Sequence, residues 1–364
     1  MNRIAALSQL IRDTEADALL LSSEIGVTYA TASTALEGKC MITKEGAAYF
    51  ITDGRYIERA QQFLTPQGFA VSVRQSGSSE SESLLQLLQS QQISAVLFED
   101  HVISLRQYET WKQSLEPIRL LPLGNRLAQL RACKAQEEID AILHAQRIAE
   151  HALEALLPSL QAGITEREAA AKLDYLMALG GSEMPSFQTI LLFGAHASMP
   201  HGVPENHSLK DGDVILVDFG AVYHGYHSDM TRTFAYGAVS DRIRSGYEAV
   251  LHAQEAAMEQ ARAGLPCRIM HEAAVNALKT AGWDTYFTHA LGHSVGLEIH
   301  EFPSAAPNVE HPLQNGMIMT VEPGIYLPGE FGIRIEDMIV IQGDTPRNLT
   351  AFPKQFRTIG NHNA

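Results

Sequence analysis

Cysteine is scarce in this chain of 364 residues, which contains only Cys40, Cys133 and Cys267. The three are odd in number, far apart and in no Cys-x-x-Cys pair, so the sequence predicts neither a disulfide framework nor a thiolate zinc cluster. Unpaired cysteines are typical of a reducing compartment, and we expect the protein in the cytoplasm.

Positive charge and long apolar runs are also lacking. Lysine and arginine number 27 against 42 aspartates and glutamates, and the net charge of −15 would repel phosphate backbones and anionic lipid surfaces. The longest stretch without formal charge, residues 184–204, contains histidine, proline and glutamine, which are costly in hydrocarbon. Arg12 and Asp13 interrupt the first apolar residues before a signal peptide could form. We therefore expect no nucleic-acid partner and no membrane segment.

The composition is that of a globular protein, with 45% hydrophobic and 19% charged residues, and the length suggests two domains. In the first part, the apolar runs 18–22, 46–52 and 95–98 alternate with amphipathic stretches, a rhythm that predicts an α/β domain. Proline and glycine at 120–125 precede a long helical period. We place the boundary at residue 128, which gives the domains 1–128 and 129–364.

The second domain is expected to repeat one order of elements, two helices followed by strands. A long helix is expected at about 137–159, and the next begins with the capping box Thr165-x-x-Glu168. The strands expected in this domain lie at 213–218, 290–298, 317–322 and 333–341. After Ser240 a long helix and a shorter one recur, which indicates a pseudo-two-fold repeat. The two halves share no detectable sequence identity, and alternating elements can also mimic a duplication.

Three apolar, strand-like runs carry a carboxylate where a buried position is expected. Asp218 ends the first run, Glu322 ends the second, and Glu336 lies inside the third. Burying an unpaired carboxylate costs several kcal/mol, so such residues are normally paired, protonated or bound to a metal ion. We expect a cation at this site.

Two further residues complete the candidate metal site. Asp229 follows Asp218 by eleven residues, and the intervening Gly220 and Gly225 suit a turn that folds the second strand back beside the first. His293 supplies an imidazole between glycines. Four carboxylates and one imidazole would be balanced by two divalent cations, and such ligands favour Mn²⁺, Co²⁺, Fe²⁺ or Zn²⁺. Two ions can clamp a carbonyl under attack, which indicates hydrolase chemistry.

Three blocks around these residues resemble one family of metallopeptidases, the prolidases, aminopeptidases P and methionine aminopeptidases, whose catalytic domain has the pita-bread fold. The blocks are 218–233 with two aspartates, 292–301 with the histidine, and 320–337 with two glutamates. Residues 51–56, Ile-Thr-Asp-Gly-Arg-Tyr, are similar to the creatinase-type N-terminal domain. The resemblance implies a mixed α/β (α+β) protein, with a creatinase-like N-terminal domain followed by a pita-bread catalytic domain.

The resemblance also implies a role for each candidate ligand. Asp218 would chelate one metal ion, and Asp229 and Glu336 would bridge both. His293 and Glu322 would complete the shell of the other ion. Glu322 is in addition the candidate catalytic residue that shuttles a proton from the attacking water to the leaving amine.

Three more residues are candidates for binding the substrate. His201 lies in Met-Pro-His-Gly-Val-Pro, which matches the Pro-His-x-x-Pro segment of the family, and His300 follows the His-ligand strand. By resemblance both histidines are catalytic, because they bind substrate and stabilise the tetrahedral oxyanion. Arg334 lies two residues before Glu336, so on one strand both would face the same side. Arg334 would hold the substrate there, or alternatively form a plain cross-strand ion pair.

By resemblance, the protein is a dinuclear metal-dependent Xaa-Pro aminopeptidase that cleaves the bond before proline in short peptides. Mn²⁺ is the expected ion, with Co²⁺, Zn²⁺ and Fe²⁺ as alternatives. An Xaa-Pro dipeptidase (prolidase) is the first alternative activity. A methionine aminopeptidase and a non-catalytic pita-bread binding protein are the next alternatives. We also expect a homodimer, in which the N-terminal domain restricts access to a neighbouring active site.

Overall fold

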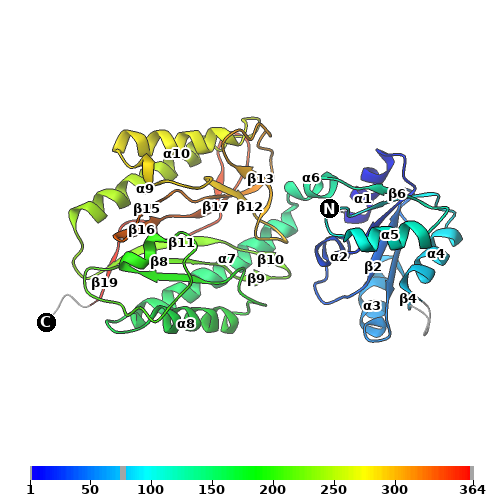
Figure 1. The fold of residues 1–364 in the computed structure, drawn as a ribbon, viewed down its shortest axis with the longest axis horizontal. Coiled ribbons are helices and arrows are strands. Elements are labelled where there is room, and N and C mark those ends of the chain that lie inside the picture. The colour runs from blue at the N-terminus through cyan, green and yellow to red at the C-terminus, as the bar shows by residue number, and fades with distance from the viewer. Residues whose placement is uncertain (1, 74–78, 361–364) are drawn as a thin grey trace. The chain divides into compact units, whose positions relative to one another are not determined.

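Two units make up the chain, Met1–Leu130 and Arg131–Ala364 (Figure 1). The computed structural model describes residues 2–73 and 79–360. Among these residues, none of the helices combines the length and the apolar character that crossing a membrane requires. The elements of the first unit are α1 (Arg3–Arg12), β1 (Ala18–Leu21), α2 (Glu24–Thr31), β2 (Lys39–Thr43), β3 (Ala48–Thr52), α3 (Ile57–Leu64), β4 (Phe69–Val73), α4 (Glu80–Ser90), β5 (Ala95–Phe98), α5 (Leu105–Ser114) and β6 (Arg119–Pro122), and α6 (Arg126–Ala132) follows them.

A single six-stranded sheet organises the first unit, in the order β4-β3-β2-β1-β5-β6. Every position of β1 is buried, as expected for an apolar strand covered on both faces. This strand pairs antiparallel with β2 and parallel with β5, so the sheet is mixed. The apolar runs predicted as strands correspond to β1, β3 and β5, which confirms the α/β organisation.

The second unit has two halves with the same order of elements, as predicted. The first half contains α7 (Gln136–Leu156), α8 (Glu166–Leu179), β7 (Ile190–Phe193), the 3-10 helix η3 (Gly194–Ser198), β8 (Val214–Phe219), β9 (Val222–Tyr223), β10 (Tyr226–His227) and β11 (Met230–Tyr236). The second half contains α9 (Asp241–Glu259), α10 (Arg268–Ala281), β12 (Gly292–Ser294), β13 (Glu301–Ala305), β14 (Ile318–Val321), β15 (Gly324–Leu327), β16 (Phe331–Arg334), β17 (Asp337–Val340), β18 (Arg347–Asn348) and β19 (Thr358–Ile359). Each half thus places two helices before a set of strands.

Each helix pair covers one sheet. The first sheet has the order β19-β11-β8-β7 and the second has the order β13-β12-β14-β17-β18. Leu153 of α7 and Leu173 of α8 lie in one buried cluster with Val217 of β8, whereas Val250 of α9 lies in another with Met319 of β14. Figure 1 shows the green helix pair α7 and α8 and the yellow pair α9 and α10 on opposite sides of the strands. The two sheets therefore face each other between the helix pairs.

The run 333–341, expected as one strand, is divided between two sheets. β16 ends at Arg334 and pairs with β15, whereas β17 begins at Asp337 and pairs with β14. Between them, the backbone N–H of Glu336 donates to the Thr231 carbonyl at 3.1 Å, so the chain leaves one ladder before it enters the next. The expectation that Arg334 and Glu336 share one strand is wrong, because this tertiary contact interrupts the apolar run.

Candidate active site

The hairpin of β8 and β11 brings Asp218 and Asp229 together. The strands pair antiparallel, with Asp218 opposite Thr231. A Cβ on Gly220 would lie 1.8 Å from the carbonyl oxygen of Ser228, so only glycine lets the two arms pass this closely. The predicted folding of the second strand back beside the first is confirmed, and both aspartates are buried.

The second sheet supplies His293 and Glu322. His293 lies on β12, and Glu322 directly follows β14. The Nε2 atom of His293 is 3.3 Å from Oε1 of Glu322 and 3.6 Å from Oδ2 of Asp229. The Thr320 hydroxyl donates to Glu322 at 3.1 Å and accepts the backbone N–H of His293 at 3.0 Å. The two sheets therefore place an imidazole against carboxylates from both halves.

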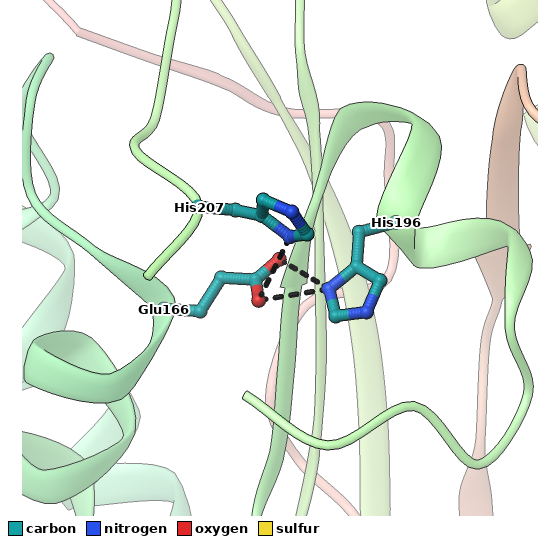
Figure 2. Close-up of side chains that lie close together, drawn as sticks. All are labelled: Glu166, His196 and His207. Atoms are coloured by element: carbon teal, nitrogen blue, oxygen red, sulfur yellow. Dashed lines mark hydrogen bonds and ion pairs between the residues drawn. The ribbon is translucent and has the colours of Figure 1, made fainter. Parts of the chain in front are cut away.

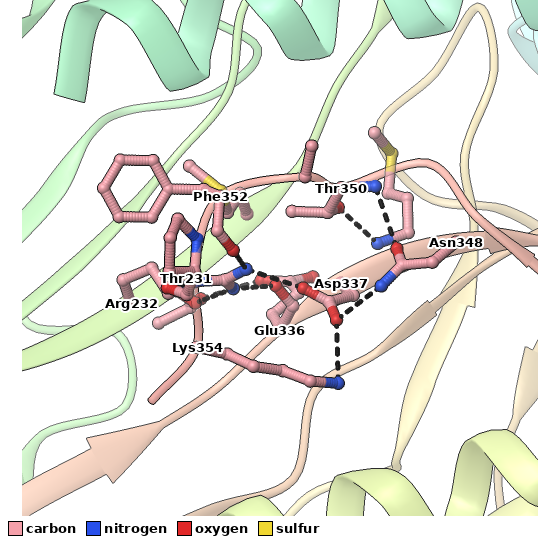
Figure 3. Close-up of polar contacts among 12 residues, drawn as sticks. Thr231, Arg232, Glu336, Asp337, Asn348, Thr350, Phe352 and Lys354 are labelled. Carbon is pink, nitrogen blue, oxygen red and sulfur yellow. Dashed lines mark hydrogen bonds and ion pairs between the residues drawn. The ribbon is translucent and has the colours of Figure 1, made fainter. Parts of the chain in front are cut away.

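Glu336 lies in the break between β16 and β17. Its Oε2 atom accepts a hydrogen bond from the Thr231 hydroxyl at 2.7 Å, and the same hydroxyl accepts from Nε of Arg334 at 3.0 Å. Behind the break, buried Arg232 donates to the Glu336 carbonyl oxygen at 2.5 Å and to Asp337 at 2.7 Å (Figure 3). Both the side chain and the backbone of Glu336 are thereby fixed.

One cavity of about 620 Å³ in the second unit is lined by every residue predicted for the site. These residues are Asp218, Asp229, His293, Glu322, Glu336, His201, His300 and Arg334. Phe187, Ile190 and Ile299 add apolar surface to the wall. Polar groups that converge in a partly apolar cavity are typical of a site for a small ligand.

The carboxylates fit divalent cations. Oδ1 of Asp218 and Oε1 of Glu336 are buried and have no hydrogen-bond partner within residues 2–73 and 79–360. Such oxygens are costly to bury unless something cationic pairs with them. Asp229, His293 and Glu336 each offer a ligand atom within 4.8 Å of the other two, so this group could hold a metal ion. Oxygen donors with an imidazole nitrogen suit Mn²⁺, Co²⁺, Fe²⁺ and Zn²⁺.

The clustered carboxylates shift one another's pKa. Burial, together with the charge of Glu336, raises the pKa of Asp229 well above its ordinary value. Burial and the charge of Glu322 raise the pKa of Glu336 in the same way. For Glu322 itself, burial acts to raise the pKa, but the hydrogen bond and charge of His293 together with the charge of Arg334 outweigh it, and the pKa is lowered. Without a bound cation, Asp229 and Glu336 therefore keep their protons to higher pH than Glu322.

We expect the apparent affinity for Mn²⁺ to rise with pH. Carboxylate ligands must lose their protons to bind a metal ion, and the raised pKa values of Asp229 and Glu336 extend this competition to higher pH than for ordinary carboxylates. Calorimetric titration with Mn²⁺ between about pH 6 and pH 8, in buffers of different ionisation enthalpy, measures both the affinity and the protons released. An affinity that stays flat over this range, with no proton release, would count against both residues as ligands.

Arg334 is buried, and its guanidinium contacts other side chains of the protein. It forms an ion pair with Asp218, and its Nη1 donates to the Tyr326 hydroxyl at 2.6 Å. That hydroxyl lies 3.0 Å from Nε2 of His289. Burial disfavours the charge, but Tyr326 and Asp218 hold the pKa of Arg334 well above its ordinary value. The ion pair, the alternative role of Arg334, is present, and binding of substrate stays a prediction.

His201 and His300 approach the cavity from two segments. His201 follows η3, and His300 directly precedes β13. The ring centroids of His293 and His300 are 4.3 Å apart. Burial and the charge of His293 lower the pKa of His300, which favours a neutral imidazole that can donate one hydrogen bond and accept another. The catalytic and substrate-binding roles of His201 and His300 stay predictions.

Two threonines that hydrogen-bond the candidate metal ligands are not among the residues predicted from the sequence. Thr231 hydrogen-bonds Glu336, and Thr320 hydrogen-bonds Glu322. Each threonine lies two residues from a predicted ligand, Thr231 after Asp229 and Thr320 before Glu322. On an extended chain, residues two apart place their side chains on the same face. This spacing is therefore the signal in the sequence from which the two threonines could be predicted.

Two family models match the chain. Residues 140–343 match metallopeptidase family M24, and residues 3–133 match the creatinase/prolidase N-terminal domain. These matches confirm the predicted fold class, a creatinase-like N-terminal domain followed by a pita-bread catalytic domain. They also confirm the prediction of a hydrolase.

The chain is similar to several peptidases over much of its length. It is 33% identical to the uncharacterized peptidase YqhT of Bacillus subtilis, over 97% of this chain and 99% of that protein. It is 38% identical to the Xaa-Pro dipeptidase of Pyrococcus furiosus, over 70% of this chain and 73% of that protein. The solved Xaa-Pro dipeptidase from Bacillus anthracis has a TM-score of 0.93 at 32% identity, and the match covers 98% of this chain and 99% of that one. The solved X-Pro aminopeptidase from Thermotoga maritima has a TM-score of 0.90 at 31% identity, covering 96% and 100%.

Proposed function

This chain belongs to metallopeptidase family M24, and from that premise we propose that it is an Xaa-Pro dipeptidase, which hydrolyses the bond before proline in Xaa-Pro dipeptides. The observation that carries the proposal is the cavity in which four carboxylates and His293 converge with His201 and His300. The names of the Pyrococcus furiosus and Bacillus anthracis relatives support the dipeptidase.

In this proposal, two divalent cations are held by Asp218, Asp229, His293, Glu322 and Glu336. When bound, the ions lower the pKa of a water molecule and polarise the scissile carbonyl. Mn²⁺ is the proposed ion, with Co²⁺, Zn²⁺ and Fe²⁺ as alternatives that the same ligands accept.

The chain's own groups would move the proton and bind the substrate. Glu322 is ionised at neutral pH because its pKa is lowered, so it can accept a proton from the attacking water and deliver it to the proline nitrogen. His201 and His300 would donate hydrogen bonds to the substrate and to the developing oxyanion. Arg334, paired with Asp218, would contact the substrate from the cavity wall.

An Xaa-Pro aminopeptidase is the second candidate function. It is the first activity that the sequence motifs imply, and the name of the Thermotoga maritima structure favours it. The names of the Pyrococcus furiosus and Bacillus anthracis relatives support the dipeptidase. A methionine aminopeptidase and a non-catalytic binding protein rank below both.

The proposal is tested by supplying the protein with Mn²⁺ and comparing Ala-Pro, Ala-Pro-Ala and Met-Ala-Ala as substrates. A dipeptidase is expected to hydrolyse only Ala-Pro. Cleavage of the proline tripeptide would replace the proposal with the aminopeptidase. Turnover of the methionine peptide alone, or of no peptide, would overturn both activities.

The remaining expectations belong to the same proposal. The N-terminal domain would span residues 1–128 and would limit access in a homodimer, so that short peptides with proline at the second position enter. Light scattering tests the dimer, and a monomer with full activity would refute it. A cytoplasmic location is supported by the free thiols of Cys40, Cys133 and Cys267.

A further inference from the structure

A second cluster of titratable side chains joins α8 to the segment that carries His201. Glu166, the first residue of α8, is fully buried. Nδ1 of His196 lies 2.9 Å and 2.8 Å from its two carboxylate oxygens, and Nδ1 of His207 lies 3.7 Å from Oε2 (Figure 2). Figure 2 shows both imidazoles directed at the carboxylate, from segments on either side of His201 in the sequence.

The same carboxylate holds both ends of the loop 194–204. Oε1 of Glu166 accepts the backbone N–H of Phe193 at 2.8 Å, and Oε2 accepts the backbone N–H of Glu205 at 2.9 Å. Phe193 is the residue before the loop and Glu205 is the residue after it. One buried side chain therefore closes the neck of this loop.

Within the described residues, the other hydrogen bonds that α8 makes to this loop are at its second end. The backbone N–H of Arg167 donates to the Glu205 carbonyl at 3.2 Å, and Nε of Arg167 donates to the Pro204 carbonyl at 3.3 Å. The N–H of Glu166 donates to the His207 carbonyl at 3.0 Å. Of the α8 groups that contact the second end of the loop, the Glu166 carboxylate is the one that also contacts the first end, at Phe193 and His196.

The loop presents its tip to the catalytic cavity. Pro200, His201, Gly202 and Val203 all line it. His201 is exposed, so the position of its imidazole depends on the backbone that carries it. Behind the tip, the Pro200 carbonyl accepts from Nη1 of Arg334 at 3.5 Å. A shift at the neck would thus be transmitted to a predicted substrate-binding group.

The two amide contacts require a carboxylate. Each Glu166 oxygen accepts one backbone N–H, and His196 lies within hydrogen-bond distance of both, so every acceptor is used without a metal ion. A glutamine has one acceptor oxygen, and its amide nitrogen would face the second N–H donor to donor. Glutamine can therefore hold one end of the loop only.

We propose that Glu166 is a positioning residue that fixes His201 in the cavity by clamping both ends of the loop 194–204. The proposal rests on the proposed function for the role of His201, but the clamp itself does not depend on that role. In the folded protein, Glu166→Gln should release one end of the loop and leave the cavity carboxylates in place.

Hydrogen exchange of the full chain tests the clamp without activity. Glu166→Gln should speed exchange of one of the two amides, Phe193 or Glu205, by at least about fivefold, the effect of losing one buried hydrogen bond. The control is Glu168→Gln, which removes an exposed carboxylate from the first turn of the same helix and contacts Thr165 rather than the loop. Equal exchange in Glu166→Gln, Glu168→Gln and the unchanged chain would overturn the clamp.

A double-mutant cycle with His201 tests the positioning role. In the Mn²⁺-supplied protein, Glu166→Gln should lower kcat/KM for Ala-Pro by about 10- to 100-fold, as misplacement of a binding group does. In a His201→Gln background the same change should cost less than about threefold, because the positioned group is already lost. Equal losses in both backgrounds would show that Glu166 does not act through His201. If the unchanged chain cleaves no peptide, the proposed function fails, and the exchange result still decides the clamp.

Discussion

Replacing Asp229 with asparagine is expected to lower the rate of Ala-Pro hydrolysis by more than about 100-fold. This loss exceeds the one that usually follows when a residue that only supports a metal ligand is replaced. Oδ2 of Asp229 lies 3.6 Å from Nε2 of His293. Asp229 also belongs, with His293 and Glu336, to the group whose ligand atoms lie within 4.8 Å of one another. Asparagine keeps the size of the side chain but removes the anionic oxygen. The Mn²⁺ bound per chain, measured by mass spectrometry after dialysis, should fall with the rate.

Asp241 provides the matched control, because it is an exposed carboxylate in the first turn of α9. Asp241→Asn should leave both the rate and the metal content unchanged. Asp229→Asn should also stabilise the metal-free protein against urea, because burial beside Glu336 and Asp218 disfavours the charged form of Asp229 and asparagine carries no charge. Unchanged turnover by Asp229→Asn would remove this residue from the site.

Replacing Arg232 with methionine is expected to reduce the free energy of unfolding by about 3–5 kcal/mol, the cost of removing one partner of a buried ion pair. Arg232 is 1% exposed and donates to Asp337 at 2.7 Å (Figure 3). It also donates to the carbonyl oxygens of Glu336, Phe352 and Pro353 at 2.5, 2.6 and 3.1 Å. Methionine leaves these acceptors, and the Thr231 carbonyl that Arg232 contacts at 2.9 Å, without this donor. Urea denaturation followed by circular dichroism measures the loss.

The control is Arg242→Met, which breaks an exposed pair with Glu330 and should cost less than about 1 kcal/mol. Burial acts to raise the pKa of Asp337, but Arg232 and Lys354 outweigh it and lower the pKa. Because the folded chain then binds fewer protons, this stabilisation is present above the ordinary carboxyl pKa and lost as the pH falls. Arg232→Met should therefore flatten the acid side of the stability profile. Equal urea midpoints for the two arginine variants would refute the assigned role of the buried pair.

Should Arg232→Met not fold, Asn348→Ala gives a milder test of the same network. Asn348 donates to Asp337 Oδ2 at 2.9 Å and accepts the backbone N–H of Thr350 at 2.9 Å, so its loss removes two hydrogen bonds and no charge. We expect a loss of about 1 kcal/mol, measured in the same denaturation series. No loss would show that Asp337 needs only its cationic partners.

The local parts of the site could be predicted because their geometry is encoded over short spacings. Asp218 and Asp229 are brought together by one hairpin, and the glycine it requires, Gly220, is visible in the sequence. The capping box at the start of α8 is likewise a contact between residues three apart, and the side chain of Thr165 accepts from the N–H of Glu168 as predicted.

The remaining parts depend on contacts between distant segments. The apolar run around Glu336 reads as one strand, and only the bond to Thr231, more than 100 residues earlier, shows where it divides. Glu166, His196 and His207 follow no metal-ligand spacing, and their convergence results from the docking of the loop onto α8. Arg334 could be placed at the site from its sequence neighbours, but its pairing with Asp218 required the position of β8.

The central claim, that these ligands support metal-dependent cleavage before proline, is tested most directly with chelator-stripped protein and Ala-Pro. We expect no hydrolysis without added metal, and activity that rises with Mn²⁺ until about two ions are bound per chain. Circular dichroism before and after stripping confirms that the chain remains folded. Equal hydrolysis with and without chelator, or none at any Mn²⁺ concentration in the folded protein, would contradict the account.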